Sequence, residues 1–130
     1  MDMDIRTLIP EHKNDFERVE MLKNYKVEEL KPIIYDLLTW LQDMNWPIAL
    51  EIQNILLNFK EDLIPHIRTI LLTDDDEWKY WILTSLMRKL PNHIIVLLKP
   101  ELERIRDHPT SDELQSDLIE EVEEILNRIL

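Results

Sequence analysis

Apolar residues recur along most of this chain at the spacing of one helix face. From Leu30 to Leu41 they fall at positions i, i+3, i+4, i+7, i+8 and i+11, which predicts an amphipathic helix. A similar stripe runs from Ile48 to Phe59, and another begins at Leu63. The pattern predicts an all-α fold.

The helices are expected to form three similar hairpins. Each opens with an apolar residue, one spacer and a proline, and the prolines Pro32, Pro65 and Pro100 are separated by 33 and 35 residues. Repetition at this period is typical of helical-repeat folds, because one helix pair cannot bury its apolar face without a neighbour. We expect one domain, residues 1–130, in which about three hairpins and about seven helices form a right-handed superhelix. The repeats are expected at approximately 27–59, 61–90 and 92–130.

The second helix of the middle repeat is apolar in two directions. At about 100° per residue, apolar residues cluster on two sides of this helix: Trp78, Trp81, Ile82 and Leu86 on one, and Tyr80, Leu83, Met87 and Leu90 on roughly the other. A helix that is apolar nearly all round is a buried one. We therefore expect this helix at the centre of the domain.

The chain is expected to begin without regular structure. Residues 1–13 carry few structural signals and are interpreted as an extended or frayed lead-in. Asn14 or Asp15 can then cap a short helix, because their side-chain oxygens accept hydrogen bonds from free N–H groups at a helix start.

Later helices also carry cap signals. Asn45 is expected to cap the second helix of the first repeat. Thr110 or Ser111 is expected to cap one long C-terminal helix, and Glu113 stands three residues after Thr110, as in a capping box. The inner stripe of that helix is expected to begin at Leu114, and its outer face is acidic.

Composition and charge narrow the function. The absence of glycine disfavours β-hairpins and phosphate-cradling loops, which depend on positive φ angles. The formal net charge is −12, and residues 101–130 contain ten acidic residues against three arginines. Binding of nucleic acid requires a basic surface, so we predict no direct contact with DNA or RNA.

The expected location is the cytoplasm. The chain has no cysteine, which excludes a disulfide framework and a thiolate zinc site and suits a reducing compartment. Its first residues lack the pattern of a signal peptide, and no apolar run reaches transmembrane length. We expect no membrane contact.

No motif for catalysis, cofactor binding or metal binding is found. The acidic run Asp74–Glu77 lacks EF-hand spacing and is better explained as the start of a helix, whose N-terminal end favours negative charge. Asp43 occupies the equivalent linker of the first repeat. The four histidines show no paired spacing, so no catalytic residue, cofactor or metal ligand is predicted.

The tryptophans give the most specific signal for a binding surface. Trp46 and Trp78 occupy corresponding places in two repeats, where they can fill the seam between repeats. The alternative is that Trp40, Trp46 or Trp81 is partly exposed and anchors a partner. We expect a partner surface that combines tryptophans and acidic residues from the linkers with the acidic face of the last helix. The candidate residues are Asp43, Trp46, Asp75, Asp76, Trp78, Lys79, Trp81, Glu120, Glu121 and Glu124.

Three stretches carry a resemblance to known families. The helix plan resembles a HEAT-type α-solenoid, and the stretches WLQDMNWP (40–47), EWKYW (77–81) and LKPELERI (98–105) are similar to an uncharacterised family of small bacterial proteins, catalogued as a domain of unknown function. The resemblance covers the chain from about Ile9 onward. It implies a HEAT-like fold and a bacterial cytoplasmic setting, without an activity.

The function expected from these features is protein binding without catalysis. An acidic surface attracts a basic partner, as in an immunity protein that neutralises a basic toxin, or in an adaptor. Two alternatives remain open: a hydrolase or lyase that uses carboxylates in the concave groove, and a homo-oligomeric structural protein. The chain is expected to be a monomer or a weak homodimer.

Overall fold

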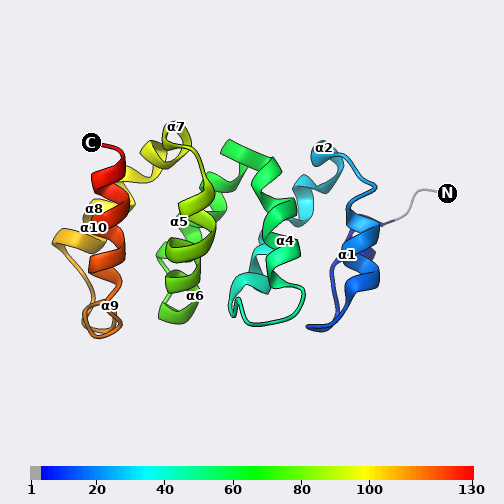
Figure 1. Ribbon diagram of the computed structural model, residues 1–130, viewed down its shortest axis with the longest axis horizontal. Coiled ribbons are helices and arrows are strands. Elements are labelled where there is room, and N and C mark those ends of the chain that lie inside the picture. The colour runs from blue at the N-terminus through cyan, green and yellow to red at the C-terminus, as the bar shows by residue number, and fades with distance from the viewer. Residues whose placement is uncertain (1–3) are drawn as a thin grey trace. The chain divides into compact units, whose positions relative to one another are not determined.

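The computed structural model describes residues 4–130, in which all regular elements are helices or helical turns (Figure 1). No β-strand occurs in these residues, so the predicted all-α fold is confirmed. The chain divides into two compact units: unit 1 ends at Leu63, and unit 2 comprises Ile64–Leu130. Every helix of the described chain is too short or too polar to cross a membrane.

Unit 1 begins with a 3₁₀ turn at Ile5–Leu8. Asp4 caps this turn by accepting a hydrogen bond from the Arg6 N–H at 3.0 Å, and Leu8 is fully buried. The expectation of an extended lead-in is therefore wrong for Ile5–Leu8, because burial of an apolar side chain holds the turn in place, whereas residues 9–13 contain no helix or strand. Residues 1–3 of that predicted segment lie outside the described residues.

Helix α1 (Phe16–Leu22) is capped by Asp15, which is one of the two cap residues predicted from the sequence. The Asp15 carboxylate is buried and accepts hydrogen bonds from the backbone N–H groups of Glu11 at 2.9 Å and Arg18 at 3.2 Å. The Arg18 guanidinium adds a contact of 3.0 Å. Burial alone would raise the pKa of Asp15, but these N–H groups and the guanidinium outweigh it, so the pKa is lowered.

The predicted first helix is divided into shorter segments. Helix α2 (Val27–Leu30) continues through a 3₁₀ turn at Lys31–Ile33 into α3 (Ile34–Leu38), and a second 3₁₀ turn covers Thr39–Leu41. Pro32 lies at the start of the first 3₁₀ turn, where it cannot donate the hydrogen bond that would continue the α-helix. All six positions of the predicted apolar stripe are nevertheless buried.

The second helix of the first repeat starts later than predicted. Helix α4 spans Ala49–Leu56, and its N-cap position is Ile48, which has no capping side chain. The N–H of Asn45 instead donates to the Asp43 carboxylate at 2.8 Å, which forms a local turn. The prediction of Asn45 as the cap is wrong, because this turn delays the helix.

Unit 1 ends in a 3₁₀ stretch, Leu57–Leu63, that is interrupted by one unusual residue. Lys60 has φ 53° and ψ −121°, a conformation that glycine adopts most readily. The chain contains no glycine, and such a strained backbone costs about 1–3 kcal/mol.

Unit 2 begins with α5 (Ile64–Leu71) and α6 (Asp76–Trp81). Helix α6 continues through a π-type turn, Ile82–Leu86, and a 3₁₀ turn, Met87–Lys89. Most apolar residues from both predicted faces of this segment are buried, as predicted, but Tyr80 is 38% exposed and Trp81 is half-buried. Those buried residues are Trp78, Ile82, Leu83, Leu86, Met87 and Leu90.

The third repeat follows the expected course at its start. Helix α7 (Asn92–Ile95) passes through a 3₁₀ turn at Val96–Leu98 into α8 (Lys99–Asp107), which has Pro100 in its first turn. The missing N–H of proline has no cost at this position. His108 ends α8.

The predicted last helix is two helices. Thr110 caps α9 (Ser111–Gln115) in a complete capping box, as predicted, but Asp117 then adopts a left-handed conformation with φ 59° before α10 (Leu118–Arg128). The break rotates α9 away from the inner stripe, so Leu114 is 55% exposed and the prediction that it lines the core is wrong.

Candidate functional site

The acidic run of unit 2 lies between α5 and α6. The Asp75 carboxylate accepts a hydrogen bond from the Trp78 N–H at 3.0 Å, and the Asp75 N–H donates to the Thr73 hydroxyl oxygen at 3.3 Å. The predicted role of this run in starting a helix is confirmed. The carboxylates of Asp74, Asp76 and Glu77 do not cap the helix.

A buried ion cluster lies directly behind this run. The Lys79 ammonium contacts Glu113 Oε2 at 3.1 Å and Asp76 Oδ1 at 3.3 Å. The Arg104 guanidinium binds both oxygens of Glu113, at 2.7 and 2.9 Å, and also donates to the Leu71 carbonyl oxygen at 3.2 Å. The cluster therefore connects α6, α8 and α9.

Glu113 is the centre of the cluster and is completely buried. Burial alone would raise the pKa of its carboxyl group, but Arg104, the Thr110 N–H and Lys79 outweigh this effect and lower the pKa to about 2. Glu113 is consequently an anion at any physiological pH, and together with Asp76 it balances the charges of Lys79 and Arg104.

Two of the predicted partner-binding side chains lie in the interior. Trp78 is 4% exposed and Lys79 is 2% exposed, so neither side chain is available to a partner in this structure. The apolar stem of Lys79 is covered and its ammonium is paired inside the fold. Trp81 is half-buried and packs edge-to-face against Tyr80, with the ring centres 5.1 Å apart.

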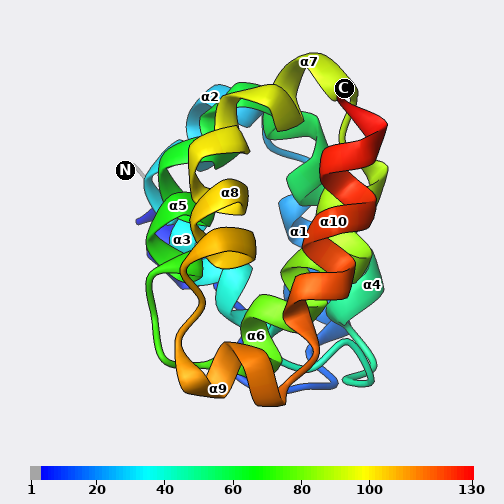
Figure 2. The same ribbon diagram turned by 90° about the vertical axis from the view of Figure 1, so that its left-hand side faces the viewer.

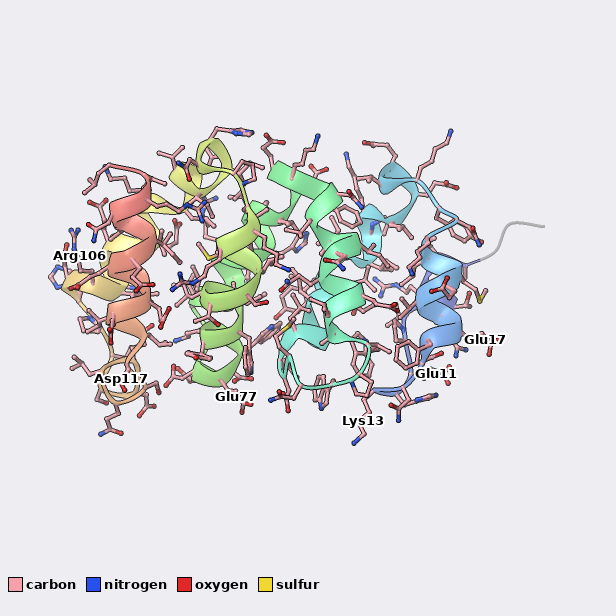
Figure 3. The ribbon with its side chains drawn as sticks, viewed as in Figure 1. Glu11, Lys13, Glu17, Glu77, Arg106 and Asp117 are labelled. Atoms are coloured by element: carbon pink, nitrogen blue, oxygen red, sulfur yellow. The ribbon has the colours of Figure 1, made fainter. Side chains whose placement is uncertain are left out.

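Exposed carboxylates gather at the end of unit 2 where α6, α9 and α10 begin. The Ser116 hydroxyl contacts Asp76 Oδ2 at 3.4 Å, which places α9 beside the start of α6 (Figure 2). Glu77 and Asp117 both lie at this end (Figure 3). We call this surface the acidic end; its residues are the exposed Asp74, Asp75, Glu77, Asp112, Asp117 and Glu120, which lie beside the half-buried Asp76.

The three predicted acidic residues of α10 have different surroundings. Glu120 is exposed at the acidic end, and no ion pair joins it to any of residues 4–130. Glu121 instead contacts Arg88 at 2.6 Å, and Glu124 contacts the same guanidinium. Glu121 and Glu124 therefore share one arginine, which balances one of their two charges.

The remaining predicted site residues, Asp43 and Trp46, belong to unit 1. The Asp43 carboxylate holds the turn before α4, as described above. Trp46 is half-buried and packs edge-to-face against Trp40, with ring centres 5.5 Å apart. Both rings keep part of their surface accessible.

The structure offers little for metal chemistry in the part of the chain that it describes. Within residues 4–130, no group of three histidine, aspartate or glutamate side chains is arranged to hold a metal ion. The carboxyl groups whose pKa clearly departs from its ordinary value are Asp15, Asp107 and Glu113, and in each the pKa is lowered.

Sequence reasoning missed part of the acidic end and most of the ion cluster. Asp112 and Asp117 belong to the acidic run of the last thirty residues, but only the break at Asp117 brings them beside α6. Glu113 was identifiable as a capping residue from its spacing to Thr110. No local pattern indicates that Arg104 and Lys79 meet there.

Comparison with known proteins identifies a family. The family model described as a domain of unknown function (DUF5071) matches residues 8–126, so the chain belongs to this family. The expected membership of an uncharacterised family is thereby confirmed. No curated protein matches the chain.

Proposed function

We propose that this member of the DUF5071 family is a non-enzymatic protein-binding module that holds a basic protein against its acidic end. The observation that carries the proposal is the separation of charge in unit 2. Exposed carboxylates occupy the acidic end, whereas the nearby cations Lys79 and Arg104 are already paired with Glu113 and Asp76.

Such a surface suits recognition of a positively charged protein. Like charges that are held close together repel one another, and a basic partner relieves this repulsion. Complementary potentials also accelerate encounter and discriminate against other acidic proteins. An acidic immunity-type protein or an adaptor needs both rapid encounter with its basic partner and discrimination against other proteins.

The repeat architecture is part of the same proposal. Pro32, Pro65 and Pro100 each lie near the start of a helical segment, which supports the interpretation of the hairpins as HEAT-like repeats. Helical repeats commonly present extended binding surfaces. Asp43, Trp46 and the exposed part of Trp81 are proposed as further contacts.

The experiment compares two variants that lose the same number of negative charges. Asp74→Asn, Glu77→Gln and Glu120→Gln are combined to neutralise the acidic end. The control variant combines Glu17→Gln, Glu20→Gln and Glu28→Gln, which are exposed residues of unit 1. Each purified protein is used as bait in host lysate at low and high salt, and bound proteins are identified by mass spectrometry.

The expected result is a basic protein that binds the wild type and the control variant at low salt. We expect this binding to weaken at high salt and to be lost with the acidic-end variant. Binding that is equal in both variants, or insensitive to salt, would contradict the proposal.

The alternative of a carboxylate-based hydrolase or lyase gains no specific support. A carboxyl group that acts as a general acid near neutral pH requires a raised pKa. The clear pKa shifts of carboxyl groups in residues 4–130 are all in the opposite direction.

A further inference from the structure

Two leucines at the acidic end are exposed to solvent. Leu72, in the linker between α5 and α6, is 70% exposed, and Leu114, in α9, is 55% exposed. Apart from the terminal Leu130, they are the most exposed large apolar side chains of residues 4–130. A partner that covers them removes apolar surface from water, which favours binding.

The segments that carry these leucines lie next to each other. The Arg104 Nη2 atom donates to the carbonyl oxygen of Leu71 at 3.2 Å and to Glu113 Oε2 at 2.9 Å, and the exposed leucines are the next residues along the chain. The α5–α6 linker and α9 also lie at the same end of unit 2 (Figure 2). Single exposed leucines are common on proteins, but two on one surface are a feature of interaction sites.

Exposed carboxylates accompany both leucines. Asp74 follows Leu72 by two residues. Asp112 precedes Leu114 by two residues, and Asp117 follows it by three. Apolar contacts at the centre with polar groups around them are the usual arrangement of a protein–protein interface. A basic chain without apolar side chains would leave both leucines in water, whereas an amphipathic basic segment complements the leucines and the carboxylates together.

We propose that the partner of the acidic end presents a basic amphipathic segment, whose apolar side chains cover Leu72 and Leu114 while its lysines or arginines meet the surrounding carboxylates. This partner is the basic protein of the proposed function, on which the specification rests. The two kinds of contact respond differently to salt, because salt screens the charges but does not weaken apolar contacts.

The test uses two synthetic peptides of equal length and charge. One is an amphipathic helix of leucine and lysine, and the other has glutamine in place of each leucine. Both are titrated by fluorescence anisotropy, at low and high salt, against the wild type and the Leu72→Gln/Leu114→Gln variant. The matched control is Leu50→Gln/Leu97→Gln, which changes two exposed leucines on other segments. Circular dichroism and thermal unfolding check each fold, and the single variants replace a pair that is unstable.

We expect the wild type and the control to bind the leucine–lysine peptide roughly tenfold more tightly than the glutamine–lysine peptide. The Leu72→Gln/Leu114→Gln variant should lose this preference but keep its affinity for the glutamine–lysine peptide, because it retains every carboxylate. High salt should weaken the binding of both peptides and leave the preference of the wild type unchanged.

The possible failures separate the two proposals. If both peptides bind the wild type equally, or if the Leu72→Gln/Leu114→Gln variant retains the preference, the amphipathic partner is overturned while the attraction of a basic partner stands. If neither peptide binds at low salt, both proposals are contradicted. The variant that neutralises Asp74, Glu77 and Glu120 should weaken both peptides equally, and a change in preference there would also overturn the role of the leucines.

Discussion

Asp15 in unit 1 and Glu113 in unit 2 are both buried carboxylates with a lowered pKa, but they are stabilised differently. The partners of Asp15 lie within four residues of it, at Glu11 and Arg18. Two of these contacts come from backbone N–H groups. Asp15 therefore organises one local turn and the start of α1.

Glu113 combines a local cap with long-range ion pairs. It accepts a hydrogen bond from Thr110 at 2.8 Å, but it also binds Arg104 and Lys79, the latter 34 residues away in sequence. Removal of Asp15 leaves Arg18, which is partly exposed and can be solvated again. Removal of Glu113 leaves Lys79 buried, so the cost of a missing carboxylate depends on whether its partner can reach water.

The largest effect is expected from Glu113→Ala. The variant should lose about 3–5 kcal/mol of unfolding free energy, because it leaves a buried cation without its main partner. Urea denaturation monitored by circular dichroism measures the change. A loss below about 1 kcal/mol would show that the cluster is not a buried ion pair in solution.

A double variant provides the control for this first prediction. Lys79→Met combined with Glu113→Leu removes both charges and should recover much of the stability lost in Glu113→Ala. If the double variant is as unstable as Glu113→Ala, the loss comes from packing, from the Thr110 cap or from the unpaired Arg104 rather than from the unpaired Lys79.

The next effect is the dependence of stability on pH. The pKa of Glu113 is about 2 in the fold against an ordinary value of 4.5, so its contribution is complete above about pH 4.5 and is lost as the pH falls toward 2. The expected loss is about 3 kcal/mol. Urea denaturation at pH 6 and near pH 2.5 should show a clearly smaller loss in Glu113→Gln than in the wild type.

Asp15→Ala should have a smaller effect, about 1–2 kcal/mol, as is usual for loss of an N-cap residue. Thermal and urea unfolding measure it, and Asp15→Asn should recover part of the loss because the amide oxygen still accepts a hydrogen bond. A loss equal to that of Glu113→Ala would remove the distinction between local and long-range stabilisation.

The smallest effect is expected from Arg88→Ala, which breaks an exposed ion-pair group with Glu121 and Glu124. Such surface pairs contribute about 0.2–1 kcal/mol. The difference from the wild type should decrease further in about 1 M salt, because exposed charges are screened. A loss above about 2 kcal/mol would mean that this guanidinium is far less solvated than the structure indicates.

Only part of the acidic end could be predicted from the sequence. Asp75 and Asp76 were identifiable because acidic residues before an apolar helix act as caps, and Glu120 because it lies on the polar face of an amphipathic helix. Trp78 and Lys79 were also placed at a partner surface, but both are buried, which for Trp78 agrees with the alternative of a core position. Helical periodicity gives the direction of a side chain, but it does not tell which neighbouring elements cover it.

The sequence by itself determined the all-α fold and most of the buried helix stripes, and it narrowed the caps to Asn14 or Asp15, the run Asp74–Glu77, and Thr110 or Ser111. These features depend on residues a few positions apart, so they can be recognised in the order of the amino acids. The tertiary structure alone decided the ion cluster around Glu113 and the break at Asp117. Both depend on which distant segments pack together, since a lysine is buried only where a carboxylate from another helix can neutralise it.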